Sequence, residues 1–247
     1  MSDNEKFIQL HHGDGPLLLA NAWNVKSAQL IEKAGFKAIA TSSGAIAASM
    51  GYADGEKMAF EEVLYIVKRI KACTGIPLTV DLERGYTDDL NVLNKNIQSL
   101  LDCGVAGINL EDAQGEDIYL KKLESINNYL IKTNQQLFVN ARTDVFLQKL
   151  PDPLETTLKR AIRYQNAGAN GLFVTGVSDP ATIKHIAGVV MLPLNIVATQ
   201  ALNTVEAIAN CGVKRISMAG FLFGATYKQL GQTAQQILAT GSYSALF

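Results

Sequence analysis

The chain has 247 residues, of which 48% are hydrophobic and 18% charged, and its formal net charge is -1. This length allows one large buried core, and the near-neutral charge gives no electrostatic footprint for nucleic acid or an anionic membrane. The chain contains no run of about 18 apolar residues that could span a bilayer. The N-terminus is polar without a signal core, and Cys73, Cys103 and Cys211 are widely spaced. We therefore expect a cytoplasmic protein with reduced thiols.

A glycine-containing phrase recurs where a helical pattern gives way to an apolar run. In each copy the glycine supplies the left-handed residue that ends a helix, and the chain then enters a strand. The phrases are Ala34-Gly35-Phe36, Cys103-Gly104-Val105, Ala167-Gly168-Ala169 and Cys211-Gly212-Val213. Their spacing is irregular, so they mark helix-to-strand junctions and not a strict repeat.

Between these junctions, short apolar strands alternate with helical patterns. The expected strands are 17–22, 38–43, 77–83, 107–112, 137–143, 171–175, 193–199 and 215–219. The expected helices are 24–34, 60–73, 88–103, 117–133, 153–167, 180–188, 204–211 and 222–240. Residues 1–16 are expected to form a short helix over the N-terminal end of the sheet. The adjacent His11 and His12 cannot share one face of a helix or strand, so we expect them in a solvated turn.

Eight alternations of strand and helix indicate a parallel sheet covered by helices. At about 30 residues each, these units match a closed (β/α)8 barrel, which makes residues 1–247 a single domain. A doubly wound open sheet is the structural alternative. The sequence G-x-G-x-x-G, typical of dinucleotide-binding sheets, is absent after the first strand, which weighs against that alternative.

The third strand ends in two carboxylates, Asp81 and Glu83, followed by Gly85. The strand period of two predicts that both acids lie on one face. Two like charges at one strand end are costly unless a cation or a proton lies between them. A hard divalent metal explains the pair, with Mg2+ preferred and Mn2+ as a substitute. Alternatively, one carboxylate accepts a hydrogen bond from a backbone amide and the other is simply solvated.

In a barrel of this type, the active site lies at the C-terminal ends of the strands. Several acids are expected to converge there, and acids inside a barrel must be paired or bind metal. We predict a metal site made by Asp81, Glu83 and Glu111, with Asp54 from the loop after the second strand. The other polar candidates at these ends include Asn109, Asp112, Asn140, Arg142, Asp144, Thr175, Asn195, Thr199 and Ser217.

Arg142 is the arginine expected at this end of the barrel, and its planar fork can clamp a substrate carboxylate. An ion pair with Asp112 or Asp144 is the alternative. Asp112 directly follows Glu111, so its side chain is expected on the opposite face of the strand. We therefore expect Asp112 to support the site from behind.

The turn Ser42-Ser43-Gly44 offers hydroxyls and backbone amides that suit a carboxylate or phosphonate oxygen. An ordinary turn with a serine helix cap remains open for this segment. Trp23, Asn195 and Thr199 are further candidates for substrate contact. For Trp23, a packed aromatic is the alternative to a pocket wall.

Five phrases occur in one family order and extend from about residue 17 to residue 225. They are Leu19-Ala20-Asn21-Ala22-Trp23, Thr41-Ser42-Ser43-Gly44 with Gly51-Tyr52-Ala53-Asp54, Val80-Asp81-Leu82-Glu83-Arg84-Gly85-Tyr86, Gly107-Ile108-Asn109-Leu110-Glu111-Asp112 and Asn140-Ala141-Arg142-Thr143-Asp144. With them the sequence resembles the isocitrate lyase/phosphoenolpyruvate mutase superfamily, in particular its short members.

The resemblance implies a (β/α)8 barrel, Mg2+, and small 2-oxo or 2-hydroxy acids that react through an enolate. It places the metal-site acids at Asp54, Asp81, Glu83 and Glu111, the substrate-carboxylate turn at Ser42, Ser43 and Gly44, and the arginine at Arg142. Many members have Asp where this chain has Glu83.

Two departures from the family bear on the reaction. Isocitrate and methylisocitrate lyases carry a loop with a proton-donating cysteine after the fourth strand, whereas this chain has Asp112-Ala113-Gln114-Gly115 there. The phosphonopyruvate enzymes have a gating loop at that place and a histidine after strand six, where this chain has Thr175. The resemblance therefore implies an intact enolate apparatus, while the parts that choose the bond to break are replaced.

Three functions follow. The leading hypothesis is a Mg2+-dependent lyase or decarboxylase that cleaves a carbon–carbon bond of a small 2-oxo acid. Decarboxylation needs no general base; a retro-aldol or retro-Claisen cleavage would need one, for which Tyr86 and Asp54 are candidates. The alternatives are a phosphonopyruvate-type mutase or hydrolase acting on a P–C bond, and a non-catalytic protein that binds a 2-oxo acid.

The final helical pattern, 222–240, is apolar on one side and can cover its own barrel or the equivalent place on a neighbour. The apolar tail at 243–247 is also easier to explain against a partner or the barrel than in water. Family members commonly exchange this helix between subunits. We therefore expect a homo-oligomer, with a tetramer favoured over a dimer, and no nucleic acid or membrane partner.

Overall fold

The computed structural model describes residues 1–247, and at its centre lies a closed barrel of eight parallel strands. The strands pair in sequence order, and β8 closes the barrel by pairing with β1, with Leu17 opposite Arg215. The predicted (β/α)8 barrel is confirmed. A doubly wound sheet is excluded because such a sheet is open, whereas here every strand has two neighbours and β8 pairs with β1.

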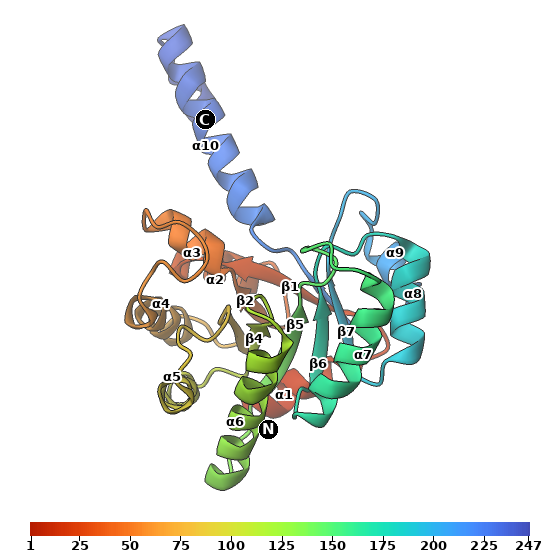
Figure 1. Cartoon of the computed structure of the whole chain (residues 1–247). Coiled ribbons are helices and arrows are strands. Elements are labelled where there is room, and N and C mark those ends of the chain that lie inside the picture. Colours follow the sequence, from red (N-terminus) through yellow and green to blue (C-terminus); the bar gives the residue numbers. More distant parts are fainter.

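Helices cover the outside of the barrel (Figure 1). The strands are β1 (Leu17–Ala22), β2 (Ile39–Thr41), β3 (Leu78–Asp81), β4 (Gly107–Glu111), β5 (Phe138–Thr143), β6 (Gly171–Val174), β7 (Leu194–Val197) and β8 (Arg215–Ser217). The α-helices are α1 (Asp3–Leu10), α2 (Val25–Lys33), α3 (Ser43–Ser49), α4 (Phe60–Ala72), α5 (Leu90–Asp102), α6 (Glu116–Thr133), α7 (Pro153–Asn166), α8 (Pro180–Val189), α9 (Val205–Ala209) and α10 (Phe221–Thr240), with a 3-10 turn at Ser244–Leu246. No helix is both long enough and apolar enough to cross a membrane.

The strand period of two divides each strand between two environments. On β3, Leu78 and Val80 belong to the core between the barrel and its helices. Thr79 and Asp81 alternate with them and pair in register with Gly107 and with Asn109 of β4. Because residues in register share a face, the barrel axis is lined by polar side chains above an apolar floor.

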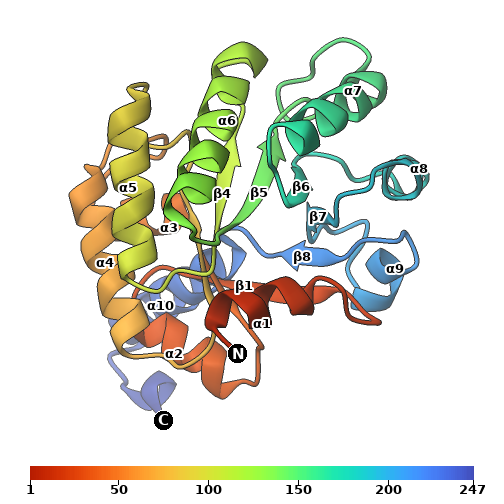
Figure 2. The same ribbon diagram turned by 90° about the horizontal axis from the view of Figure 1, so that it is seen from below.

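The floor of the barrel is closed by α1, which crosses its N-terminal end (Figure 2). The helix begins with a capping box between Ser2 and Glu5, and its Phe7 is fully buried against the barrel. The expected short helix is therefore present.

The expectation for His11 was wrong. Its ring is 2% exposed and stacks on Phe138 with the ring centroids 4.1 Å apart, while Nδ1 lies 2.8 Å from the carbonyl oxygen of Phe7. Burial and the nearby Arg215 lower the pKa of His11 to about 3, so the ring is neutral. His12 is exposed, as expected.

One helix was not expected from the sequence. The segment predicted as a loop after the second strand begins with α3, whose alanines favour helix. Ser42 caps it, because its hydroxyl accepts a hydrogen bond from the amide of Ala45 at 3.3 Å. The cap interpretation of this turn is thus present in the structure.

The last long helix does not return along the outside of the barrel. Figure 1 shows α10 extending away from the barrel end at which β8 finishes. None of its residues is buried, and Phe221, Leu230 and Leu238 are 60%, 60% and 88% exposed. An isolated apolar face of this size is typical of a surface that another chain covers.

We predict that α10 mediates a homo-oligomer, with a tetramer favoured over a dimer. Light scattering at micromolar concentration should give a multiple of 26.7 kDa, and Leu230→Asp should shift the mass toward that of one chain by placing a charge in the contact. Gln232→Asp introduces the same charge about 200° around the helix and should leave the mass unchanged. A monomeric parent protein would refute the prediction.

Candidate functional site

Three of the predicted acids lie at the C-terminal ends of β3 and β4. Asp81 is the last residue of β3, and Glu111, the last of β4, pairs in register with Arg142 of β5. Glu83 was predicted to lie on the third strand, but β3 ends at Asp81 and Glu83 has a φ of 48°. A left-handed turn, and not strand alternation, brings Glu83 to Asp81.

The environment of Glu83 and Glu111 disfavours their charged forms. Burial, reinforced by the charge of Asp81, raises the pKa of Glu83 to about 7. Burial likewise raises the pKa of Glu111 to about 8, an effect that Arg142 opposes and Asp81 adds to. Carboxyl groups in this state bind either protons or a cation.

Asp81 has one oxygen engaged and one without a protein partner. Its Oδ2 accepts hydrogen bonds from the Ser43 hydroxyl at 2.8 Å and the Ser43 amide at 3.3 Å. Its Oδ1 is buried with no hydrogen-bond partner. No three His, Cys, Asp or Glu side chains are grouped so that they could hold a metal ion together. The acids predicted as the metal site, Asp54, Asp81, Glu83 and Glu111, are therefore not grouped as a set of direct ligands. The unpartnered Oδ1 of Asp81 is the observation that fits Mg2+, which usually binds one or two carboxylates and several waters.

Asp54 lies on the exposed loop between α3 and α4. A Cβ atom added to Gly44 would come within 3.0 Å of Asp54 Oδ2, so the carboxylate rests against the start of α3. A larger residue at position 44 would push the Asp54 carboxylate away from the start of α3. Asp54 is also close enough to Glu83 for its charge to raise the pKa of Glu83 further.

Arg142 is held between two acids at the barrel mouth. Its Nε and Nη2 donate to the two carboxylate oxygens of Asp144 at 2.7 and 2.9 Å, and its Nη1 lies 2.7 Å from Glu111 Oε2. Burial disfavours the guanidinium charge, but Glu111 and Asp144 outweigh burial and raise the pKa of Arg142. Of the two ion pairs considered from the sequence, the one with Asp144 forms.

Asp112 supports this arrangement from behind, as its strand parity predicted. It is 2% exposed and accepts hydrogen bonds from the Thr143 hydroxyl at 2.7 Å and the Asp144 amide at 2.9 Å. Arg160 Nη1 and the Tyr164 hydroxyl of α7 also donate to it, both at 2.6 Å. Four donors satisfy this buried carboxylate, which ties the end of β4 to the end of β5.

Two hydroxyl groups near the mouth each donate a hydrogen bond to one of the acids. The Thr175 hydroxyl, just after β6, donates to Asp144 Oδ1 at 2.5 Å. The Tyr86 hydroxyl donates to Glu83 Oε1 at 3.0 Å. Burial and the charge of Glu83 raise the pKa of Tyr86, so this phenol is a hydrogen-bond donor and a poor base.

The remaining sequence candidates have other neighbours. Trp23 is 7% exposed and packs edge-on against Phe223 at 5.3 Å. Asn195 is fully buried inside the barrel, where its Oδ1 accepts a hydrogen bond from Ser217, and Thr199 accepts one from the amide of Leu202. Asn195 pairs in register with the first residue of β8, so it lies below the mouth.

Sequence reasoning missed a buried cation beneath the site. Arg215 is 1% exposed, donates from Nη2 to Asn109 Oδ1 at 2.9 Å, and leaves Nε and Nη1 without partners. Burial lowers the pKa of Arg215, and the charge of Asp81 opposes that effect. The sequence could have predicted this position, because Arg215 lies two residues before Ser217 on the same strand and side chains two residues apart share a face.

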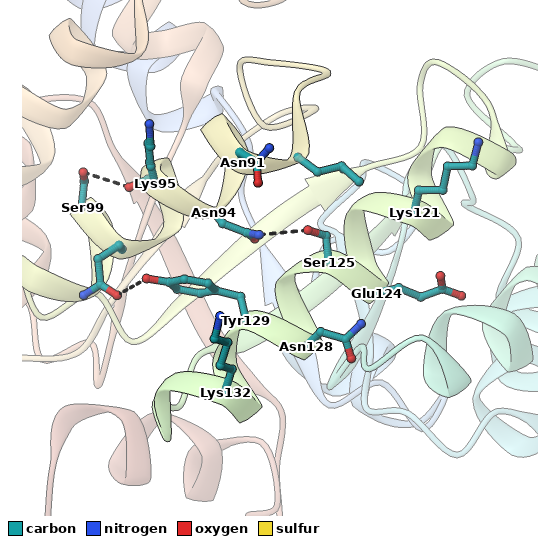
Figure 3. Close-up of a pocket in the computed structure, with 12 residues that line it drawn as sticks. Asn91, Asn94, Lys95, Ser99, Lys121, Glu124, Ser125, Asn128, Tyr129 and Lys132 are labelled. Carbon is teal, nitrogen blue, oxygen red and sulfur yellow. Dashed lines mark hydrogen bonds between the residues drawn. The ribbon is translucent and has the colours of Figure 1, made fainter.

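A second concave region lies away from the acids, on the outside of the barrel between α5 and α6 (Figure 3). It encloses about 880 Å³, and its lysines are Lys95, Lys121 and Lys132. Asn94 and Ser125 bond across it at 3.0 Å, as do Tyr129 and Gln98 at 2.6 Å. These bonds tie the two helices to each other, and the groove holds no cluster of acids comparable to the barrel mouth.

The fold and site together define a (β/α)8 protein with an acid-rich mouth and one clamped arginine. The family model of phosphoenolpyruvate phosphomutase matches residues 7–238. The chain belongs to this family.

Several relatives are enzymes, and they do not share one activity. An uncharacterized protein of Mycobacterium tuberculosis is 31% identical over 89% of this chain and 83% of its own. The oxaloacetate decarboxylase of Pseudomonas fluorescens is 28% identical over 92% of this chain and 83% of its own. The 2-methylisocitrate lyase of Escherichia coli is 27% identical over 73% of this chain and 64% of its own.

Solved structures agree with the fold. A proposed phosphonomutase of Burkholderia cenocepacia superposes with a TM-score of 0.90 at 32% identity, covering 94% of this chain and 99% of its own. The structure of 2,3-dimethylmalate lyase superposes with a TM-score of 0.88 at 18% identity over 99% of this chain and 90% of its own. At that identity, the second likeness shows the fold alone.

We predict that millimolar Mg2+ raises the melting temperature, because an ion that binds only the folded state stabilises it. Asp81→Ala should abolish the rise, since it removes the oxygen that has no protein partner. Asp89→Ala, in the helix cap of α5, is the matched control and should retain it. If Mg2+ still raises the melting temperature of Asp81→Ala, the metal site described here is wrong.

The raised carboxyl pKa values predict a pH dependence of stability in the metal-free protein. Folding raises the pKa of Glu83 from its usual 4.5 to about 7, so the folded state binds more protons than the unfolded state between these values. Raising the pH through that window therefore lowers the melting temperature in EDTA. Glu83→Gln should reduce this dependence, and Mg2+ should offset it in the parent protein. A melting temperature that rises from pH 5 to pH 7 would contradict the assignment.

Proposed function

We propose that this protein is a Mg2+-dependent lyase or decarboxylase that cleaves a carbon–carbon bond of a small 2-oxo acid. The observation that carries the proposal is the guanidinium of Arg142, fixed by Asp144 and Glu111 beside Asp81 and Glu83. A fixed positive charge next to acids in need of a cation suits a substrate that carries a carboxylate and gains negative charge as it reacts.

When bound, Mg2+ supplies a Lewis acid that polarises the 2-oxo group. Asp81 would hold it through the unpartnered Oδ1, with Glu83 and Glu111 acting through water. Arg142 contributes a positive charge that needs no reorganisation, because Asp144 orients its fork. In a decarboxylation, the electron pair of the broken bond moves into the enolate, carbon dioxide leaves, and solvent later supplies a proton to carbon.

The position of the thiols favours a reaction that needs no cysteine acid. Cys73, Cys103 and Cys211 each lie just after a helix, at the N-terminal end of the barrel and opposite the mouth. The connection between β4 and α6 consists of residues 112–115 and contains neither cysteine nor histidine. The raised pKa of Tyr86 also weighs against this residue as a base, which leaves Asp54 for a retro-aldol cleavage.

A phosphonate reaction is the second candidate, and the proposed phosphonomutase of Burkholderia cenocepacia, at 32% identity, is the observation that favours it. Such a reaction also uses a carboxylate clamp. The barrel mouth offers Arg142 but no lysine or histidine at the ends of β4 and β6 to meet a phosphonate. A third possibility, ligand binding without turnover, uses the same acids and arginine.

The deciding experiment is NMR of purified protein with Mg2+ and a panel of acids. Oxaloacetate or a 4-hydroxy-2-oxo acid should be consumed, while methylisocitrate and phosphonopyruvate should remain. Because Mg2+ alone decarboxylates oxaloacetate slowly, the Asp81→Ala protein with the same Mg2+ is the control. Formation of phosphoenolpyruvate from phosphonopyruvate, or release of phosphate from it, would establish the second candidate. Mg2+-dependent binding without consumption would establish the third.

Arg142→Lys keeps the charge but loses the planar fork. On the substrate that turns over, we expect kcat/KM to fall about 100-fold, comparable to removal of one preorganised donor in other enzymes. Arg163→Lys on α7 makes the same change at a half-exposed ion pair with Glu116 and should leave kcat/KM unchanged. Equal rates for the two variants would exclude Arg142 from the reaction.

A further inference from the structure

The loop that follows β3 carries a run of left-handed backbone at the edge of the candidate site. Glu83, Gly85 and Tyr86 have φ values of 48°, 103° and 60°. This conformation is unfavourable for residues other than glycine, so it persists where surrounding contacts impose it. At Gly85 a Cβ atom would lie 2.7 Å from Leu93 Cδ1, so a side chain here would also force the buried Leu93 to shift.

Glu56, from the loop between α3 and α4, binds this backbone with its carboxylate. Its Oε1 accepts hydrogen bonds from the amides of Arg84 and Tyr86, both at 2.8 Å. Its Oε2 lies 2.9 Å from Arg84 Nη2. Backbone amides that converge from left-handed turns form a concave anion site. In this protein the anion is a carboxylate of the chain itself, and we call the contact the Glu56 seat.

The other side of the same loop is also bonded. Lys122 of α6 is 2% exposed, and its Nζ donates to the carbonyl oxygen of Arg84 and to Asp88 Oδ1, both at 2.8 Å. Asn96 of α5 donates to the carbonyl oxygen of Gly85 at 3.2 Å. The peptide groups between Glu83 and Tyr86 are therefore held by three elements distant in sequence, and the Glu56 seat is the contact that comes from the Asp54 loop.

Two functional candidates depend on where this loop lies. The Tyr86 hydroxyl donates to Glu83 Oε1 at 3.0 Å, and the carbonyl oxygen of Glu83 accepts a bond from the amide of Glu111 at 2.8 Å. A shift of the Arg84–Tyr86 peptides would therefore move both Glu83 and Tyr86. Asp54 lies two residues before Glu56, so the same carboxylate fixes the loop that carries Asp54.

We propose that Glu56 is a positioning residue whose carboxylate, seated on the Arg84 and Tyr86 amides, sets the place of Glu83 and Tyr86 and joins them to the Asp54 loop. The role of Glu83 as a Mg2+ site rests on the proposed function, whereas the seat itself does not. Glu56 contacts no substrate in this account and acts through the backbone it holds.

Hydrogen exchange followed by mass spectrometry tests the seat without any substrate. Glu56→Ala should speed exchange in both 84–88 and 50–57, and should weaken Mg2+ binding by roughly 10-fold or more, as loss of an outer-shell partner does at metal sites. Glu56→Asp shortens the arm by one methylene and should show the same pattern if the alanine variant does not fold. Unchanged exchange at 84–88 in a folded Glu56→Ala or Glu56→Asp variant would overturn the proposal.

Two variants separate the seat from the ion pair. Glu56→Gln keeps an oxygen for both amides, and Arg84→Met removes the ion pair but leaves the amides, so both should exchange like the parent protein at 84–88. If Arg84→Met reproduces the loss seen in Glu56→Ala, the ion pair and not the seat holds the loop, and the proposal is wrong.

Glu62→Ala is the matched control for loop stability. Glu62 also accepts bonds in this region, from the amide of Ala59 at 3.2 Å and the hydroxyl of Tyr52 at 3.0 Å. Its loss should affect 52–59 and leave 84–88 protected; equal loss of protection at 84–88 would also overturn the proposal. The exchange pattern stands apart from turnover, so a protein with no activity on the acid panel but with this pattern would fail the proposed function alone.

Discussion

The constraint on which the site depends is negative charge that the chain does not neutralise by itself. Asp81, Glu83, Glu111 and Asp144 gather at the ends of three neighbouring strands around the single guanidinium of Arg142. Asp144 receives two bonds from that guanidinium and one from Thr175, and Glu111 pairs with its remaining nitrogen, so no protein cation pairs directly with Asp81 or Glu83. Burial then raises the pKa of Glu83 and Glu111, and a cation is the partner that would allow both to ionise together with Asp81.

The sequence was sufficient for the acids whose position follows from strand geometry. A parallel barrel brings the carboxyl ends of all strands to one mouth, so Asp81, Glu111 and Arg142 could be placed there from the strand pattern alone. Parity also separated Asp112 from Glu111, and the structure shows Asp112 bonded to four donors behind the site. These predictions succeed because strand period and barrel closure are properties of the backbone.

The predictions that failed depend on contacts between segments far apart in the chain. His11 was expected in a solvated turn, but its place is decided by Phe138, which lies 127 positions later and stacks on its ring. Glu56 showed no motif, because its partners are backbone amides of a loop whose left-handed conformation is not visible in residue types. Glu83 was assigned to the right place for the wrong reason, since a turn and not a strand positions it.

The strand ends and the loops that follow them contribute differently to the chemistry of the site. The strand ends hold the charges, and their geometry follows from the barrel whatever bond is broken. The connections after β2, β3 and β4 differ in kind: one is exposed and tied down through Glu56, one is left-handed, and one spans only residues 112–115. Under the proposed function, the arginine and the acids at the strand ends suit an enolate whichever bond is broken. We therefore infer that the connections after β2, β3 and β4, and not the acid cluster, decide which bond of the substrate breaks.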